Sequence, residues 1–234
     1  MQGKLIVFEG VEGSGKTTQI AQTQAWLTEH QWFKSLQQQG AQLILTREPG
    51  GTALGKTLRQ LLLHSTSDDP IDDRTELLLY AADRAQHVEA YLKPLLRQGA
   101  LILCDRFTDS TVAYQGYGRG LDRDLIDQLN QIATGGLQSD LTFWLDLDAE
   151  IGLARAKNRA THDRIEQIPL SFHRRVQQGF TELANAHPHR IVRIDANRPP
   201  DQVAAHIQTV LQQRLMEWYP PSENPLLYWG ASPM

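Results

Sequence analysis

The chain has 234 residues, a formal net charge of −4 and 41% hydrophobic residues. This length suits one well-buried core, and the composition excludes a disordered or fibrous protein. The slightly acidic balance argues against neutralisation of a nucleic-acid backbone, so we expect no nucleic-acid partner. The first apolar run, residues 5–8, is too short for a signal peptide or a membrane span. With its lone cysteine, Cys104, the chain suits a reducing compartment, and we expect a cytoplasmic protein with no membrane association.

Short apolar runs alternate with segments of helical pattern along the chain. The expected strands span residues 5–8, 43–45, 101–104, 141–145 and 191–194. The expected helices span residues 17–39, 53–63, 73–98, 122–133, 150–158, 170–186 and 200–219. This alternation predicts an α/β fold with a five-stranded parallel sheet flanked by helices. We expect one domain over residues 1–215, and a tail over residues 216–234 that is packed on the surface or flexible.

A phosphate-binding pattern follows the first expected strand. The residues Gly10, Val11, Glu12, Gly13, Ser14, Gly15, Lys16 and Thr17 fit GxxxxGK[ST], and a helix follows them. Glycines let successive backbone N–H groups face a phosphate, and the N-terminus of the helix adds positive charge. Lys16 is expected to contact the β- and γ-phosphates of ATP and Thr17 to bind Mg²⁺. Thr18, the next residue, completes the expected ATP site.

The third expected strand ends in a carboxylate, Asp105, and resembles a Walker B strand. At the carboxyl edge of a parallel sheet, Asp105 would hold Mg²⁺ through water. Phosphate-binding loops also occur in switch proteins. Guanine-nucleotide switches carry Asn-Lys-x-Asp and Asp-x-x-Gly motifs, and neither occurs in this sequence.

Three further segments resemble thymidylate kinases of the bacterial type, a group of P-loop nucleoside monophosphate kinases. They are residues 46–52 (TREPGGT), 77–85 (LLLYAADRA) and 105–116 (DRFTDSTVAYQG). With the phosphate-binding loop they match the family in order and spacing, over residues 5–215. The resemblance implies a P-loop NTPase fold with a lid, a homodimer, and transfer of the γ-phosphoryl group of Mg·ATP to dTMP to give dTDP.

The resemblance also implies an acceptor site. Its implied residues are Glu12, Arg47, Glu48, Pro49, Tyr80, Arg84, Arg106, Ser110, Thr111, Tyr114 and Gln115. Tyr80 and Arg84 are four residues apart on one expected helix, so a ring for base stacking and a donor for a base carbonyl share a face. By resemblance Arg106 holds the acceptor phosphate, Tyr114 crowds the place of a 2′-hydroxyl and Glu12 holds the 3′-hydroxyl.

A basic stretch, residues 154–166, resembles the family's lid. Some relatives carry an arginine inside the phosphate-binding loop where this chain has Ser14, so a lid cation is expected to take part in catalysis. Arg155, Arg159 and Arg164 are the candidates, unranked, beside Lys16, Arg106 and Asp105. Arg198 lies in a loop that resembles the border of the adenine site.

Three alternative functions stay open at this point. The chain could phosphorylate another nucleoside monophosphate, such as dUMP, dCMP or GMP, because one methyl group gives only about 1 to 3 kcal/mol of discrimination. It could be a non-catalytic nucleotide-binding switch module. A DNA-dependent ATPase would need a basic strand-binding surface, which the net charge of −4 does not supply.

Overall fold

The computed structural model describes residues 2–38, 40–64, 70–157 and 164–220. Five parallel strands form one sheet in the order β2-β3-β1-β4-β5, which confirms the predicted fold class. The strands are β1 (Lys4–Glu9), β2 (Leu43–Arg47), β3 (Leu101–Asp105), β4 (Leu141–Asp146) and β5 (Ile191–Asp195). Each of them contains one of the predicted apolar runs, because a strand covered on both faces has little need of polar residues.

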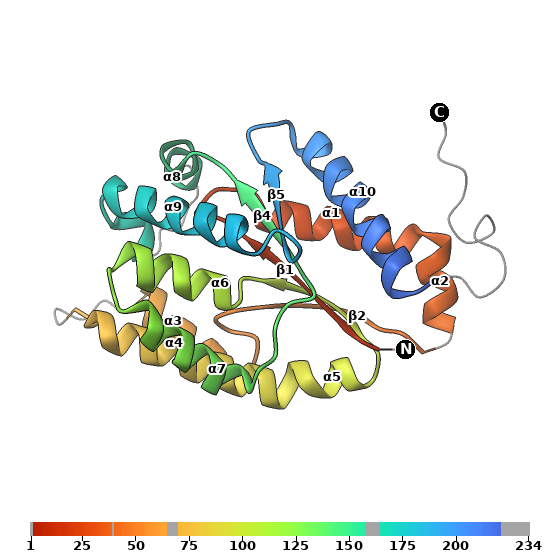
Figure 1. The fold of residues 1–234 in the computed structure, drawn as a ribbon, viewed down its shortest axis with the longest axis horizontal. Helices are drawn as coiled ribbons and strands as arrows, with labels where there is room; N and C mark the ends of the chain where they lie inside the picture. The colour runs from red at the N-terminus through yellow and green to blue at the C-terminus, as the bar shows by residue number, and fades with distance from the viewer. Residues whose placement is uncertain (1, 39, 65–69, 158–163, 221–234) are drawn as a thin grey trace.

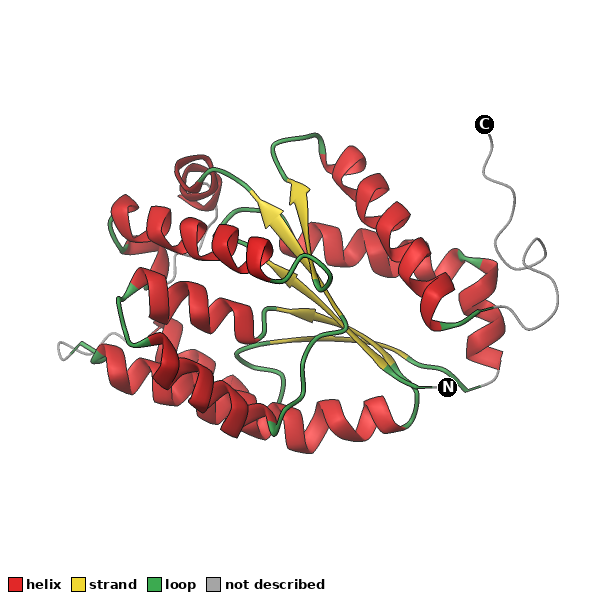
Figure 2. Ribbon diagram, viewed as in Figure 1, coloured by secondary structure: helices red, strands yellow, loops and turns green. Residues whose placement is uncertain are grey.

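Helices cover both faces of this sheet (Figures 1 and 2). The α-helices are α1 (Lys16–Glu29), α2 (Gln31–Gln38), α3 (Ala53–His64), α4 (Asp73–His87), α5 (Lys93–Arg97), α6 (Thr108–Thr111), α7 (Arg123–Thr134), α8 (Ala149–Lys157), α9 (Leu170–Ala186) and α10 (Pro200–Trp218). Two π-helical segments, η1 (Val88–Leu92) and η2 (Val112–Gly118), and a short 3-10 helix, η3 (Ile165–Gln167), complete the described elements. None of the helices in the described part of the chain is long and apolar enough to cross a bilayer.

Alternate residues of the central strand, β1, belong to two different hydrophobic clusters. Ile6 and Phe8 of β1 join the large cluster that includes residues of α1, α9 and α10. Leu5 and Val7 join a smaller cluster with η1. This alternation follows from the two-residue repeat of a strand. The carboxyl edge of the sheet is polar because the strands end at Glu9, Arg47, Asp105, Asp146 and Asp195.

The prediction of one continuous helix over residues 17–39 is wrong. His30 has extended backbone (φ −70°, ψ 128°), and the chain divides there into α1 and α2. The break lets Trp32 and Phe33 turn into the large cluster, where they are 4% and 0% exposed. Burial of two large aromatic side chains therefore outweighs the helical propensity of the segment.

The helix predicted over residues 73–98 is continuous but not uniform. It runs through α4, η1 and α5, and Pro94, which has no backbone N–H group, follows directly after the π-helical segment η1. A second helical stretch, α6 followed by η2, is not among the predicted helices. Most of its residues belong to the motif at residues 105–116.

The last described helix and the cysteine of β3 are both well defined. α10 continues past residue 215 to Trp218, and the hydroxyl of Tyr219 donates to the Gln2 carbonyl at 2.7 Å. The tail predicted from residue 216 otherwise lies at residues 221–234, outside the described residues. Within β3, Cys104 is fully buried, and burial raises the pKa of its thiol well above the usual value.

Strand register brings the predicted motifs together. Asp105 of β3 lies opposite Phe8 of β1 and Arg47 of β2. The loops that follow these three strands therefore start from one edge of the sheet, at the place where ligands of open parallel sheets bind.

Candidate active site

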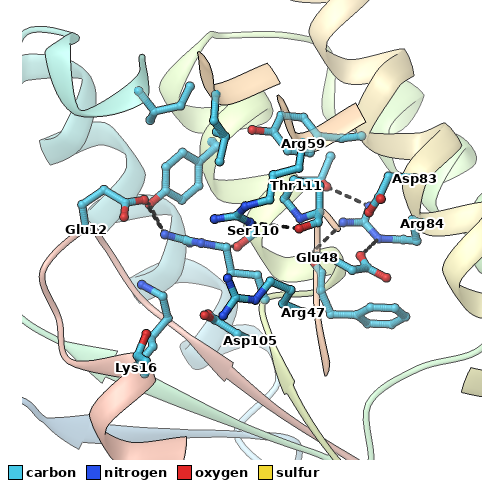
Figure 3. Close-up of a pocket in the computed structure, with 18 of the residues that line it drawn as sticks. Glu12, Lys16, Arg47, Glu48, Arg59, Asp83, Arg84, Asp105, Ser110 and Thr111 are labelled. Carbon is cyan, nitrogen blue, oxygen red and sulfur yellow. Dashed lines mark hydrogen bonds and ion pairs between the residues drawn. The ribbon is translucent and has the colours of Figure 1, made fainter. Parts of the chain in front are cut away.

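A cavity of about 580 Å³ lies at this edge of the sheet. The loop between β1 and α1 lines one side, with Glu12 and Lys16, and Glu48 and Arg84 lie on the opposite side (Figure 3). This volume is typical of a site for a small organic ligand. The two groups of residues that the sequence selected separately therefore border one cavity.

The loop between β1 and α1 depends on glycine. Gly10, Gly13 and Gly15 have φ angles of 144°, 70° and 93°, which other residues adopt at a cost. Packing makes a second demand, because a Cβ on Gly13 would lie 2.1 Å from the carbonyl oxygen of Gly152 in α8. A Cβ on Gly152 would meet the carbonyl oxygen of Glu12 at 2.3 Å. Backbone therefore packs directly on backbone where the loop meets α8.

Lys16 begins α1 and turns its ammonium group back over the loop. Its Nζ donates to the carbonyl oxygens of Gly10 and Val11, each at 3.0 Å. Burial lowers the pKa of Lys16 to about 8, and the nearby guanidinium of Arg106 acts in the same direction. A phosphate beside Nζ would oppose both effects, so this position favours a polyphosphate.

Arg106 follows β3 with left-handed backbone (φ 71°), which is uncommon for a residue other than glycine. Its Nη1 donates to the Gly10 carbonyl and to Ser110 Oγ, both at 3.1 Å. Its Nη2 donates to the carboxylate of Glu12 and, at 3.0 Å, to the hydroxyl of Tyr114. These contacts hold Arg106 between the glycine loop and η2. Unusual backbone at such a point is typical of functional sites.

Glu9, the last residue of β1, supports the same turn. Its fully buried carboxylate accepts hydrogen bonds from the backbone nitrogens of Phe107 (2.8 Å) and Ser110 (3.1 Å), and from Ser110 Oγ (2.6 Å). Burial raises the pKa of Glu9 to about 7. Glu9 thereby ties the strand before the glycine loop to the turn that carries Arg106.

Arg59 in α3 is a cavity residue that sequence reasoning missed. Its Nη1 donates to the Pro49 carbonyl at 2.9 Å, and it lines the cavity with Arg47 and Arg106. Burial lowers the pKa of Arg59, and repulsion from Arg47 adds to the shift. Three guanidinium groups bordering one cavity favour an anionic ligand. Because α3 carries no motif, nothing in the sequence distinguishes Arg59 from an ordinary surface arginine.

Arg84 on α4 is fixed by four hydrogen bonds. Its Nε donates to Glu48 at 2.7 Å, and its Nη1 donates to Thr111 and Asn130, both at 2.8 Å. Its Nη2 donates to the Phe107 carbonyl at 3.0 Å. The side chain is 3% exposed, so the guanidinium forms a rigid part of the cavity wall.

Other polar side chains secure the loop after β2. The ring of His87 is hydrogen-bonded to Glu48 at 2.9 Å and to Thr46 at 2.8 Å. Asp83 accepts a hydrogen bond from the backbone nitrogen of Gly50 at 3.1 Å, and burial raises the pKa of Asp83 to about 6. These contacts hold residues 46–50 against α4.

Aromatic and amide side chains close the far part of the cavity. The ring of Tyr114 lies edge-on to Phe172 and Phe180, with centroids 6.2 and 6.3 Å away. Tyr80 is partly buried and lines the cavity, four residues before Arg84 on α4. Gln115, which follows Tyr114 in the sequence, also lines the cavity and is 3% exposed.

Thr17 and Asp105 border the cavity beside Lys16. Asp105 Oδ1 is buried and has no hydrogen-bond partner among the residues that the structure describes. A carboxylate oxygen and a hydroxyl are the hard donors that Mg²⁺ prefers, and Mg²⁺ keeps several water ligands of its own. The donor set therefore fits a magnesium ion bound mainly through water and phosphate.

The arginines expected near the phosphoryl donor, ATP, lie in different places. Arg155, in α8, lines the cavity. Arg159 lies outside the described residues. Arg198 is 63% exposed and donates to Asp195 at 3.1 Å, so its side chain faces solvent after β5.

Arg164 directs its guanidinium away from the described cavity lining. Its Nε donates to the Leu62 carbonyl at 3.0 Å, and its Nη2 donates to the buried carboxylate of Glu76. The residue thereby joins the chain before η3 to α3 and α4.

Most of the sequence-selected residues thus meet at one cavity. The lining includes Glu12, Gly13, Gly15, Lys16, Thr17, Thr18, Arg47, Glu48, Pro49, Tyr80, Arg84, Asp105, Arg106, Ser110, Thr111, Tyr114, Gln115 and Arg155. The loop residues Gly10, Val11 and Ser14 are not among the described lining residues. Residues that were not selected also contribute, namely Arg59, Leu63, Asp83, Phe107 and Ile165.

Comparison with known proteins shows the family of the chain. The family model described as thymidylate kinase matches residues 8–207. The thymidylate kinase of Cyanothece sp. (strain PCC 7425 / ATCC 29141) is 61% identical over 229 residues, covering 94% of this chain and 98% of the relative. That of Trichodesmium erythraeum (strain IMS101) is 59% identical over 223 residues, covering 93% and 99%. The crystal structure of thymidylate kinase from Ehrlichia chaffeensis superposes with a TM-score of 0.72 at 35% identity, covering 91% of this chain and 100% of that one. The chain belongs to the thymidylate kinase family.

Proposed function

We propose that this chain transfers the γ-phosphoryl group of ATP to dTMP, which yields ADP and dTDP. The observation that carries the proposal is the single cavity with a glycine-rich phosphate loop on one side, Arg47 and Arg59 on the other (Figure 3), and Arg106 between them. Such an arrangement suits two anionic ligands that face each other, as a phosphoryl transfer between nucleotides requires.

On the donor side, residues 10–18 bind the phosphates of ATP. Backbone N–H groups of the loop and the N-terminus of α1 face the β-phosphate, and Lys16 moves its ammonium group from the loop carbonyls to the β- and γ-phosphates. Thr17 and Asp105 hold Mg²⁺, which when bound offsets charge on the phosphate oxygens. Arg155 is the described lid-side cation at the cavity, and Arg159 remains a candidate from the sequence.

On the acceptor side, Arg47, Arg59 and Arg106 bind the phosphate of dTMP. A guanidinium presents paired N–H groups that match two phosphate oxygens. The acceptor phosphate is largely deprotonated near neutral pH, so no general base is required. The residues around the acceptor phosphate therefore need only to bind and orient it.

The nucleoside of dTMP occupies the remainder of the cavity. The ring of Tyr80 stacks on thymine, and Arg84 donates to a base carbonyl. Tyr114 is held by Arg106 and Glu12 at 3.0 Å each, so its ring is a fixed wall beside the sugar. We infer that this wall disfavours a 2′-hydroxyl and that Glu12 accepts from the 3′-hydroxyl.

A coupled assay that detects ADP tests this function with purified protein. dTMP, dUMP, dCMP and GMP are compared at equal concentration with Mg·ATP. The expected result is the highest kcat/KM for dTMP and little ADP release without an acceptor. If another monophosphate gave the highest value, the substrate assignment would be wrong. ATP binding with no acceptor-dependent ADP release would instead support a switch module.

We further propose that the chain forms a homodimer through α3, α4 and α7, which pack side by side (Figure 1). Apolar side chains are exposed on all three, namely Leu54 (51%), Leu61 (49%), Leu78 (52%), Leu125 (40%) and Ile132 (77%). Exposed apolar side chains on adjoining helices favour association with a second copy. Light scattering should give twice the monomer mass of 26.4 kDa, and Ile132→Glu should lower the dimer fraction. A monomer mass for the unmodified chain would contradict this proposal.

The cytoplasmic location and the lack of a nucleic-acid partner stay predictions from the sequence.

A further inference from the structure

Glu76 is a buried carboxylate that no step of the proposed reaction uses. It lies on α4, one turn before Tyr80, and is 0% exposed. It is not among the described residues that line the cavity, yet it contacts one that does: Gln115 Nε2 donates to Glu76 Oε1 at 2.9 Å. On its other oxygen it accepts from Arg119 Nη2 at 2.9 Å and from Arg164 Nη2.

The two arginines keep this carboxylate ionised. Burial alone would raise the pKa of Glu76, but the hydrogen bond from Arg164 and the charge of Arg119 outweigh it and hold the pKa below its usual value. An ionised carboxylate accepts hydrogen bonds and donates none. The side chain of Gln115 must therefore turn its NH₂ group toward Glu76, because the opposite orientation would place two acceptors against each other.

This orientation leaves the carbonyl oxygen of Gln115 as the acceptor that its amide offers to a ligand. Arg84 lines the same cavity, and its guanidinium carries five N–H donors, four of which are used by the protein contacts described above. With the remaining N–H of Arg84 turned to the ligand, the wall would offer an acceptor from Gln115 and a donor from Arg84. Thymine and uracil present the complement at one edge, with an N3–H donor and an O4 acceptor. Cytosine presents the reverse, an N3 acceptor and an N4 amino donor.

We infer that Glu76 is a positioning residue that sets the selectivity of the acceptor site for imide bases, thymine and uracil, over cytosine, by fixing the orientation of the Gln115 amide. The inference rests on the proposed function and adds to it the source of one part of its specificity. Glu76 acts without contact to the ligand. Its partners Arg119 and Arg164 serve by keeping it charged.

The first test replaces Glu76 by Gln, which both donates and accepts, so that the Gln115 amide loses its fixed orientation. The values of kcat/KM are measured for dTMP, dUMP and dCMP. The dTMP/dCMP ratio should fall at least about tenfold in Glu76→Gln, in line with the loss of one base-reading contact. The dTMP/dUMP ratio should not change, because both bases carry the same imide edge. The KM for ATP should also stay constant.

A double-mutant cycle separates this role from a merely structural one. Gln115→Met removes the amide, so Glu76→Gln should have no further effect on the dTMP/dCMP ratio in that background. An equal fall in both backgrounds would overturn the inference. Glu76→Gln removes the carboxylate that pairs with Arg164 and leaves Arg119 with Asp73, 3.2 Å away, so the variant could fail to fold and Glu76→Asp is the second variant. Glu76→Asp keeps the negative charge but moves it away from Gln115. It should lower the dTMP/dCMP ratio by a smaller factor than Glu76→Gln does.

The outcomes distinguish this inference from the proposed function. A wild-type enzyme that prefers dTMP, with an unchanged dTMP/dCMP ratio in Glu76→Gln and Glu76→Asp, would refute the role of Glu76 alone. A wild-type enzyme that does not phosphorylate dTMP would refute both.

Discussion

The two sides of the cavity are built in different ways. The phosphate-binding loop of the donor side is one uninterrupted segment, residues 10–18, and it depends on backbone groups, on the φ angles of three glycines and on one lysine. The acceptor side is assembled from β2, α3, α4, the end of β3 and η2, and it depends on side chains. Four arginines, Arg47, Arg59, Arg84 and Arg106, line the acceptor side, whereas Lys16 is the one basic residue in residues 10–18.

This difference predicts how each side responds to substitution. A site that relies on one ammonium group and on close backbone packing should fail when either is changed. A site in which several guanidinium groups share one anion should lose affinity in smaller steps. The following experiments test this contrast, beginning with the largest expected effect.

Replacement of Lys16 by Ala should lower kcat/KM for the transfer by about 10³-fold or more, because nearby Arg106 is already held by Gly10, Glu12, Ser110 and Tyr114 and does not take over the charge of Lys16 at the phosphates. The thermal unfolding midpoint should change little. Steady-state kinetics with both substrates measures the effect. Lys34→Ala, which removes an exposed lysine on α2, is the matched control and should behave as wild type. Near-normal turnover in Lys16→Ala would refute the role of Lys16.

Gly13→Ala should reduce the free energy of unfolding by about 3 kcal/mol. Alanine is unfavourable at the positive φ of this position, and its Cβ would clash with the backbone of α8. The control is Gly120→Ala, which has a similar φ of 78° but no atom within 4 Å of the added Cβ. It should cost only about 1 kcal/mol. Urea unfolding of both variants measures the difference. Equal losses would show that packing against α8 contributes nothing.

Glu9 lies between the two sides, and its titration should be visible in stability. Its pKa is about 7 in the folded chain, above the ordinary 4.5, so the folded state binds the proton more tightly. The stability from this group is present below pH 4.5 and is lost as the pH rises through 7. Between pH 5 and 8 the wild type should therefore lose about 2 to 3 kcal/mol relative to Glu9→Gln. Urea unfolding at several pH values measures this, and parallel curves would contradict it.

Arg59→Gln should have the smallest effect of the four. We expect the KM for dTMP to rise about tenfold with little change in kcat or in the KM for ATP, because Arg47 and Arg106 still face the phosphate. Arg97→Gln, at an exposed position on α5, is the control. A loss as large as that of Lys16→Ala would show that the acceptor arginines do not share their task.

Much of the fold and all of the glycine loop could be predicted from the sequence because they depend on local patterns. Apolar runs marked the five strands, and the spacing of glycines, Lys16 and Thr17 marked the loop. The helix break at His30 could not be predicted in this way. It depends on the burial of Trp32 and Phe33 against residues distant in sequence, which local propensity does not contain.

The acceptor side shows the same limit. Its motif residues were found through family resemblance, whereas Arg59 and Glu9 gained their significance only from tertiary contacts. Arg164 is a basic residue in a basic segment, and its sequence does not reveal that its partner is Glu76, 88 positions away. Long-range pairs of this kind decide which charges face a ligand and which hold the wall.

The buried thiol in β3 has a practical consequence for experiments on this enzyme. Cys104 is the one cysteine in the sequence, it is fully buried, and its thiolate is strongly disfavoured at neutral pH. Because thiol reagents attack the accessible thiolate, they should leave the native chain unmodified. A cysteine introduced at any exposed position would then take up a spectroscopic probe selectively, with no need to remove the natural one. Pairs of such probes on α8 and α3 would report distances across the cavity during turnover.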